Sequence, residues 1–256
     1  MNYNYHTHTA RCRHASGTER NYIEAALAAG ITKIGFSEHV PLRFPDGRES
    51  IYRLPIAEAE EYMAVLRALR EEYKGRADIR IGFEMEYYPL YFKDTVQYAR
   101  DLGAEYLILG QHYLYNESRY EFRTYAPSDS ERDLCEYVNC ITEGIKTGVF
   151  TYVAHPDIFS FTGDTAIYER EIRRLCQTAR EFNVPLEINF LGIREGRRYP
   201  ADRFWKIAGE VGAPVTFGLD AHDEPSAGDT KSLPRALELV EKYRLNYIGE
   251  PKIVFL

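Results

Sequence analysis

Residues 215–222 read Val-Thr-Phe-Gly-Leu-Asp-Ala-His, a short apolar run that ends in a carboxylate and an imidazole two positions apart. A helical pattern over residues 201–211 precedes this run. A short apolar run next to a helical pattern is typical of a buried strand in a βα unit. The stretch therefore predicts one strand of a parallel sheet, with polar side chains just beyond its carboxyl end.

The same kind of run recurs along the rest of the chain. Each run is short and apolar, and each is separated from the next by a polar connection or a helical pattern. The predicted strands are residues 3–6, 33–37, 79–84, 106–110, 152–154, 186–189 and 215–219, with residues 252–255 as a possible eighth.

Helical periodicity fills the intervals between these strands. The predicted helices are residues 19–29, 56–73, 95–102, 128–146, 165–182, 201–211 and 232–243. Pro55 suits the first turn of the second helix, and Asp94 is expected to cap the third. Such alternation indicates an α/β fold, and seven or eight βα units favour one closed barrel over an open sheet. No linker or composition shift divides the chain, so we expect a single domain over residues 1–256.

Composition and charge narrow the classes of function. The 256 residues are 45% hydrophobic and 28% charged, which is ordinary for a globular chain and excludes disorder. With 32 Lys and Arg against 39 Asp and Glu the net charge is −7, which argues against long nucleic acids as partners. Apolar windows are too short to cross a membrane. The four cysteines and the lack of a leading apolar region indicate reduced thiols and a cytoplasmic protein.

The histidines collect at the predicted strand ends. His6 and His8 close the first strand, where a period of two directs both rings to the same side. Of the seven histidines, only His14 lies away from a strand terminus. Glu84 and Asp220 also end strands. The other histidines at strand ends are His39, His112, His155 and His222.

This distribution favours a metal site over a set of unrelated histidines. Any one of these rings alone would be read as a buried polar group that has found a partner. In parallel α/β folds, however, the carboxyl ends of the strands converge on one cleft, so these side chains would meet. Imidazoles and carboxylates without a cysteine set suit zinc, iron or manganese. Nine candidate ligands exceed the needs of one ion and imply two or three ions, with Glu84 as the leading bridge. Glu38 and Glu86 would support the ligands or face solvent.

The ordered motifs resemble the polymerase and histidinol phosphatase (PHP) superfamily over nearly the whole chain, and look most like its histidinol-phosphate phosphatases of histidine biosynthesis. The motifs are Tyr5-His6-Thr7-His8 with His14, Ser37-Glu38-His39, Gly82-Phe83-Glu84, Gly110-Gln111-His112, Ala154-His155-Pro156-Asp157, Leu186-Glu187-Ile188-Asn189 and Gly218-Leu219-Asp220-Ala221-His222. The resemblance implies a distorted seven-stranded (β/α) barrel that holds three metals. It implies one ion at His6, His8, Glu84 and Asp220, a second at Glu84, His112 and His155, and a third at His14, His39 and His222.

The resemblance also suggests substrate residues, and the chain departs from the family pattern at two places. An acidic residue often precedes the first histidine pair, where this chain has Asn4-Tyr5. An arginine commonly follows the fifth-strand histidine, where this chain has residues 158–161, Ile-Phe-Ser-Phe. Arg194 matches a family position. The other candidates for substrate binding are Arg197, Arg198 and Tyr113.

We expect hydrolysis of a phosphate monoester, most simply L-histidinol phosphate, by water activated between ions that share Glu84. Asp220 or His222 would relay a proton to the leaving group, and the sequence does not choose between them. The alternatives are a phosphodiesterase or phosphatase for another small phosphoester such as a nucleotide, and a metal-binding domain without activity. The polar connections at residues 42–54 and 114–126 are expected to cover the substrate. The thiol of Cys12 could touch metal but is read as a bystander, and the oligomeric state stays open.

Overall fold

The computed structural model of the protein describes residues 1–117 and 123–256. Its strands form one parallel sheet in which the spatial order follows the chain order. The strands are β1 (Tyr3–Asn4), β2 (Lys33–His39), β3 (Asp78–Met85), β4 (Tyr106–Leu109), β5 (Phe150–Val153), β6 (Leu186–Asn189), β7 (Pro214–Gly218) and β8 (Asn246–Tyr247).

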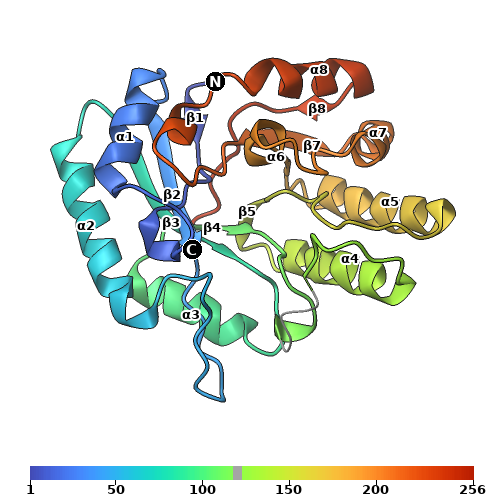
Figure 1. The fold of residues 1–256 in the computed structure, drawn as a ribbon, viewed down its shortest axis with the longest axis horizontal. Helices are drawn as coiled ribbons and strands as arrows, with labels where there is room; N and C mark the ends of the chain where they lie inside the picture. The colour runs from blue at the N-terminus through green and yellow to red at the C-terminus, as the bar shows by residue number, and fades with distance from the viewer. Residues whose placement is uncertain (118–122) are drawn as a thin grey trace.

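Helices cover the outer side of the curled sheet (Figure 1). The α-helices are α1 (Glu19–Ala28), α2 (Ala59–Glu72), α3 (Phe92–Leu102), α4 (Glu131–Lys146), α5 (Thr165–Glu181), α6 (Phe190–Arg194), α7 (Asp202–Val211) and α8 (Leu233–Tyr243). Four short 3₁₀ helices lie among the described connections: η1 (Ala10–Cys12), η2 (Ile56–Glu58), η3 (Tyr115–Glu117) and η4 (Pro225–Gly228).

The sheet closes on itself between its first and seventh strands. Just beyond β1 and β7, Thr7 and Ala221 form a parallel bridge, and the amide of His8 donates to the carbonyl of Ala221 at 2.9 Å. Pairing is sparse on the opposite side, where Val153 and Leu186 are the one pair that joins β5 to β6. The predicted α/β fold with a distorted barrel is confirmed. The sheet has eight strands rather than the seven that the resemblance implied.

The eighth strand lies earlier in the chain than predicted. Asn246 and Tyr247 pair with β7, whereas residues 252–255 are not assigned to a strand. These last residues cross the amino end of the barrel instead of pairing with a neighbour. The amide of Val254 donates to the hydroxyl of Thr151 at 3.2 Å, and the amide of Leu256 donates to the carbonyl of Glu105 at 3.1 Å. The prediction of a strand at 252–255 was therefore wrong.

Two helix boundaries also differ from prediction. Asp94 lies inside the first turn of α3 and does not cap it. The helix already starts at Phe92, whose amide donates to the carbonyl of Tyr88. Helix α4 begins after Ser130, whose hydroxyl accepts from the amide of Asp133, so it starts three residues later than expected. The short helix α6 directly after β6 was not predicted.

Two apolar clusters hold the barrel around the site. The larger one packs the helices onto the outer face of the sheet, and a smaller one fills the barrel interior with Tyr3, Tyr5, Tyr106, Ile108, Tyr152 and Ala154. Burial of aromatic side chains dominates the stability of such cores. In the described part of the chain, none of the helices combines the length and apolar character needed to cross a membrane.

Candidate metal centre

All seven histidines meet at the carboxyl end of the barrel. His39 is the last residue of β2 and Glu84 lies near the end of β3, while His112, His155 and Asp220 lie two or three residues beyond the ends of β4, β5 and β7. The rings of His6 and His8 have centroids 5.2 Å apart, as expected for a pair directed to one side. His14, which the strand pattern could not place, reaches the same cluster from the segment after η1, with its ring 4.9 Å from that of His222.

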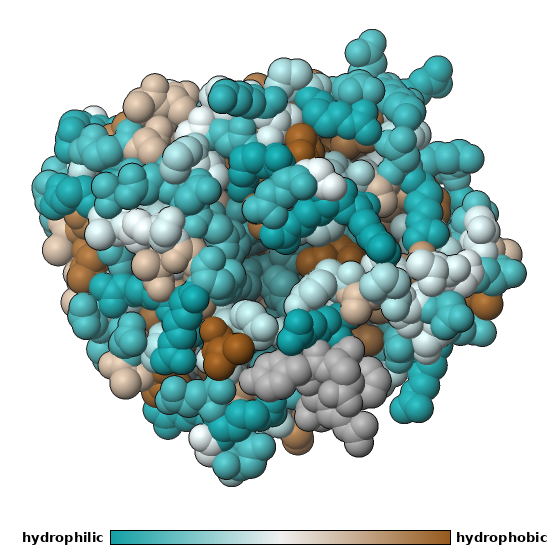
Figure 2. All heavy atoms as spheres, viewed as in Figure 1, coloured by the Kyte–Doolittle hydropathy of each residue, from teal (hydrophilic) through white to brown (hydrophobic). Residues whose placement is uncertain are grey.

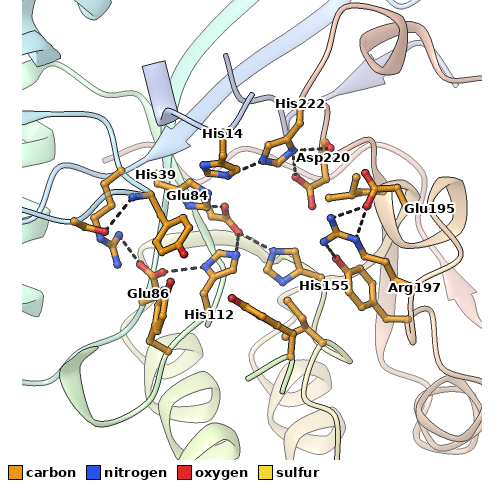
Figure 3. Close-up of a pocket in the computed structure, with 18 of the residues that line it drawn as sticks. His14, His39, Glu84, Glu86, His112, His155, Glu195, Arg197, Asp220 and His222 are labelled. Carbon is orange, nitrogen blue, oxygen red and sulfur yellow. Dashed lines mark hydrogen bonds and ion pairs between the residues drawn. The ribbon is translucent and has the colours of Figure 1, made fainter. Parts of the chain in front are cut away.

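Glu84 lies at the centre of the cluster (Figure 3). Its Oε1 is 2.9 Å from His155 Nε2 and 3.5 Å from His112 Nε2. Its Oε2 is 3.1 Å from His39 Nδ1 and 3.3 Å from His8 Nε2. The two carboxylate oxygens therefore face different groups of imidazoles, which is the arrangement required of a carboxylate that bridges two cations.

Asp220 faces the first histidine pair. Its Oδ1 is 3.5 Å from His6 Nε2, 3.6 Å from His8 Nε2 and 3.2 Å from His222 Nδ1. His222 then turns its Nε2 toward His14 Nε2, at 3.1 Å. The nitrogen atoms of His14, His39 and His222 lie within 4.8 Å of one another, so they form a third group beside those that contain Glu84.

Three further carboxylates support the rings from behind. Glu187 Oε1 bonds His6 Nδ1 at 2.9 Å, and Glu86 Oε1 bonds His112 Nδ1 at 2.9 Å. Glu38 Oε2 lies 3.7 Å from His8 Nδ1. A hydrogen bond at one ring nitrogen fixes the orientation of the other, which then faces the centre. Glu187 lies in one of the ordered motifs, but the sequence alone gave it no role.

Charge and burial set the protonation of the cluster. Burial opposes ionisation of Glu84 and Asp220, but the neighbouring imidazoles outweigh it and hold the pKa of both carboxyls well below the usual range. Burial together with His222 and His8 lowers the pKa of His14 to about 4. Burial opposes protonation of His6, yet the charges of Asp220, Glu187 and Glu84 raise its pKa. The carboxyls of Glu84 and Asp220 are therefore ionised, and both would attract a cation placed between them.

The donor atoms at the centre fit a divalent metal. Within residues 1–117 and 123–256, His6 Nε2, His8 Nε2, both oxygens of Glu84 and Asp220 Oδ1 are buried without a hydrogen bond. Buried polar atoms almost always have partners, so a converging set without them needs an explanation. A bound cation would satisfy all of them, and histidine with carboxylate is a donor set that zinc, iron and manganese accept.

A cavity of about 580 Å³ opens over this cluster. It corresponds to the hollow on the face of the molecule seen in Figure 2. One wall carries Tyr52, Tyr113 and Tyr125, from the connections that follow β2 and β4, and these connections thus reach the site as predicted. Part of the second connection, residues 118–122, lies outside the described residues. Arg197, Arg198 and Tyr199, from the connection between α6 and α7, also line the cavity.

Comparison with known proteins agrees with this geometry. A family model described as the PHP domain matches residues 4–190. The chain belongs to the PHP domain family. It is 30% identical to a histidinol-phosphatase of Bacillus subtilis over 255 residues, which covers 87% of this chain and 94% of the relative. It is 29% identical over 232 residues to a protein of Deinococcus radiodurans named "Probable histidinol-phosphatase", which covers 87% of both chains.

A solved structure shares the fold. Histidinol phosphate phosphatase from Lactococcus lactis, crystallised with zinc, L-histidinol and phosphate, superposes with a TM-score of 0.73. The match covers 96% of this chain and 95% of the other at 20% identity. The shared fold therefore extends over nearly the whole chain, including the part after residue 190.

The predicted substrate residues of this PHP domain divide into two groups. Tyr113, Arg197 and Arg198 line the cavity. Arg194 is not among the lining residues, because its guanidinium donates to the carbonyls of Leu219 at 3.1 Å and Asp220 at 3.2 Å, and pairs with Asp229. It holds the backbone that carries a candidate ligand and does not face the cavity.

The thiol of Cys12 lies beside the PHP cluster. It is buried and donates to the carbonyl of Thr9 at 3.1 Å. Its sulfur is within 4.8 Å of nitrogen atoms of His8 and His222. Burial raises the pKa of the thiol, which keeps it protonated.

Proposed function

We propose that this protein is a metal-dependent phosphomonoesterase that hydrolyses L-histidinol phosphate to L-histidinol and phosphate in histidine biosynthesis. The observation that carries the proposal is the convergence of eight candidate metal ligands around a ninth, Glu84, beneath a cavity whose wall carries arginines. The histidinol-phosphatases of Bacillus subtilis and Lactococcus lactis, which share the family and the fold, support the choice of substrate.

The residues that would hold the metals are those that meet at Glu84, Asp220 and His14. His6, His8, Glu84 and Asp220 would hold one ion. Glu84, His112 and His155 would hold a second, and His14, His39 and His222 a third. When bound, zinc, iron or manganese ions lower the pKa of a water molecule toward about 7 and neutralise phosphate oxygens.

Arg198 is the arginine best placed to bind the phosphate dianion. Arg197 is neutralised by Glu195 at 2.7 Å, and its Nη1 donates to the hydroxyl of Tyr199. In the described part of the chain Arg198 forms no ion pair, and its Nη1 donates to the hydroxyl of Ser160 at 2.6 Å. Ser160 lies in the segment where the family commonly has an arginine. The guanidinium of Arg198, which comes from the connection between α6 and α7, therefore reaches the same region. A guanidinium without a carboxylate partner binds phosphate oxygens in a forked geometry.

Asp220 and His222 form the pair that would pass a proton to the leaving alkoxide. Both line the cavity, and His222 Nδ1 lies 3.2 Å from Asp220 Oδ1. An acid and an imidazole at this distance can hold a proton between them and give it to the alkoxide as the P–O bond breaks.

The test combines metal analysis with turnover of histidinol phosphate. We expect bound divalent metal and phosphate release in the wild-type protein, and loss of both in Glu84→Gln and His155→Ala. Arg198→Met should raise KM for histidinol phosphate more than Arg197→Met does, because the charge of Arg197 is already neutralised. Turnover by metal-stripped protein would overturn the mechanism. Hydrolysis of a nucleotide in preference to histidinol phosphate would overturn the substrate.

A further inference from the structure

A buried network of charges lies next to His112, outside the set of candidate ligands. Arg53 Nη1 is 2.7 Å from Glu86 Oε2, and its Nη2 is 2.6 Å from Glu117 Oε2. Glu86 offers its other oxygen to His112 Nδ1 at 2.9 Å, as the dashed line in Figure 3 shows. All three charged side chains are at most 4% exposed.

The network joins three separate connections at the carboxyl end of the barrel. Arg53 comes from the segment after β2, Glu86 directly follows β3, and Glu117 ends the 3₁₀ helix η3 after β4. The hydroxyl of Tyr88 donates to Glu117 Oε2 at 3.3 Å, and Arg53 Nη1 also donates to the carbonyl of Val40 at 3.5 Å. Each end of the guanidinium is thus held in place, and so is the Glu86 carboxylate that it contacts.

Stability alone does not explain such a network. Removing charges from water costs several kcal/mol for each ion, and a well-packed apolar group of similar volume is often no less stable. Two carboxylates share one guanidinium, so one negative charge is left over, and its nearest partner is the ring of His112.

We propose that Arg53 and Glu117 are positioning residues that hold Glu86 so that the His112 ring is fixed, with Nδ1–H donating to Glu86 and Nε2 facing Glu84. His112 Nε2 lies 3.5 Å from Glu84 Oε1, in agreement with this orientation. The inference rests on the proposed metal centre and not on the identity of the substrate. It assigns a role in metal binding to Glu117, which touches no candidate ligand and lies behind Arg53.

The experiment measures the metal affinity of the whole 256-residue chain. Zinc content would be determined by elemental analysis, and zinc affinity by competition with a chromophoric chelator, in Arg53→Met, Arg53→Lys and Glu117→Gln. We expect Arg53→Met and Glu117→Gln to lower the zinc affinity of the site that contains His112 by about 10- to 100-fold. This is the usual effect of removing a group that orients a ligand. Arg53→Lys should restore part of the affinity, because an ammonium keeps the charge but cannot bridge both carboxylates.

Glu105→Gln is the matched control. Glu105 also pairs with arginines, Arg70 at 2.8 Å and Arg80 at 3.4 Å, but it lies at the amino end of the barrel, far from the histidines. This variant should lose stability without losing zinc affinity. A second readout is the ¹⁵N spectrum of the His112 ring, which reports directly whether Nδ1 or Nε2 carries the proton.

Wild-type zinc affinity and an unchanged His112 spectrum in Arg53→Met and Glu117→Gln, with only a lower melting temperature, would overturn the inference. If Arg53→Met does not fold, Glu117→Gln and Arg53→Lys decide it, because both keep the side-chain volume. Failure of the wild-type protein to hydrolyse histidinol phosphate would defeat the proposed substrate, but normal zinc binding in that protein would leave this inference in force.

Discussion

Glu84 reaches the centre of the histidine cluster because the neighbouring strand leaves room for it. Gly110 directly follows β4, and a Cβ built at this position would overlap the Glu84 carboxylate. Gly218, the last residue of β7, leaves room for Glu187 in the same way. Glycine is needed at both positions for close approach and not for a positive φ. The positions of Glu84 and Glu187 thus depend on Gly110 and Gly218, because any larger residue there would overlap their carboxylates.

Replacing Gly110 with Ala should therefore displace Glu84. We expect Gly110→Ala to lose bound metal and phosphatase activity to about the same extent as Glu84→Gln, and to lose about 1–3 kcal/mol of stability through overpacking. Gly148→Ala is the control, because it strains a residue at a φ of 72° with nothing within 4 Å of the added carbon. The control should lower stability and retain metal. Elemental analysis and urea unfolding of both variants measure the two effects, and full metal content in Gly110→Ala would contradict the argument.

At the scale of elements, one buried carboxylate docks helix α7 onto the connection after β5. Asp157 Oδ2 accepts the backbone amide of Ala201 at 2.6 Å and the indole N–H of Trp205 at 2.9 Å. Ala201 precedes the first residue of α7 and offers no side-chain cap of its own. Burial nevertheless dominates, and it raises the pKa of Asp157 to about 7.

This raised pKa makes stability depend on pH. In the unfolded chain the carboxyl of Asp157 titrates near 4, and in the folded chain near 7, so the folded chain binds the extra proton between these values. The contribution of Asp157 is therefore largest below about pH 4 and is lost as the pH rises to about 7, a change of at most about 4 kcal/mol. The free energy of unfolding of Asp157→Asn should lack this dependence on pH, because an amide does not titrate in this range. Urea unfolding of both proteins at several pH values from about 4 to 8 gives the difference, and parallel curves would refute the assignment.

The pattern of strands and the identities of the candidate ligands were visible in the sequence, because apolar runs and polar strand ends are local features. The run at residues 186–189 has the same bounds in the structure. Contacts between distant segments were not visible: Arg194 could not be assigned to the carbonyls of Leu219 and Asp220 from its spacing alone. Glu187 did leave a signal, since a carboxylate between Leu186 and Ile188 in a buried strand needs a partner. The expected ligand roles and the single domain over residues 1–256 remain predictions.

At the scale of the whole molecule, the site joins parts of the barrel that backbone pairing holds weakly. The register shifts between β4 and β5, and β5 meets β6 through a single pair of residues. His112 and His155 follow β4 and β5 on this weak side, whereas His6 and Asp220 lie next to the bridge that closes the barrel. Glu84 faces both sides. Cations held at Glu84 would therefore link the two seams of the barrel as well as take part in the reaction.

Removal of metal should therefore loosen the barrel as well as abolish activity. A ligand that binds the folded chain alone at 1,000 times its Kd adds about 4 kcal/mol of stability, so chelation should lower the melting temperature by several degrees. Amide exchange should rise most near the bridge between Thr7 and Ala221 and near the pair of Val153 and Leu186, because the cations connect these seams.

Calorimetry and hydrogen exchange of metal-loaded and chelated protein measure both effects. Glu84→Gln, which lacks the bridging carboxylate, should respond far less to the chelator. An equal melting temperature with and without metal, or exchange that rises only at the histidines, would show that the cations contribute nothing to closure of the barrel.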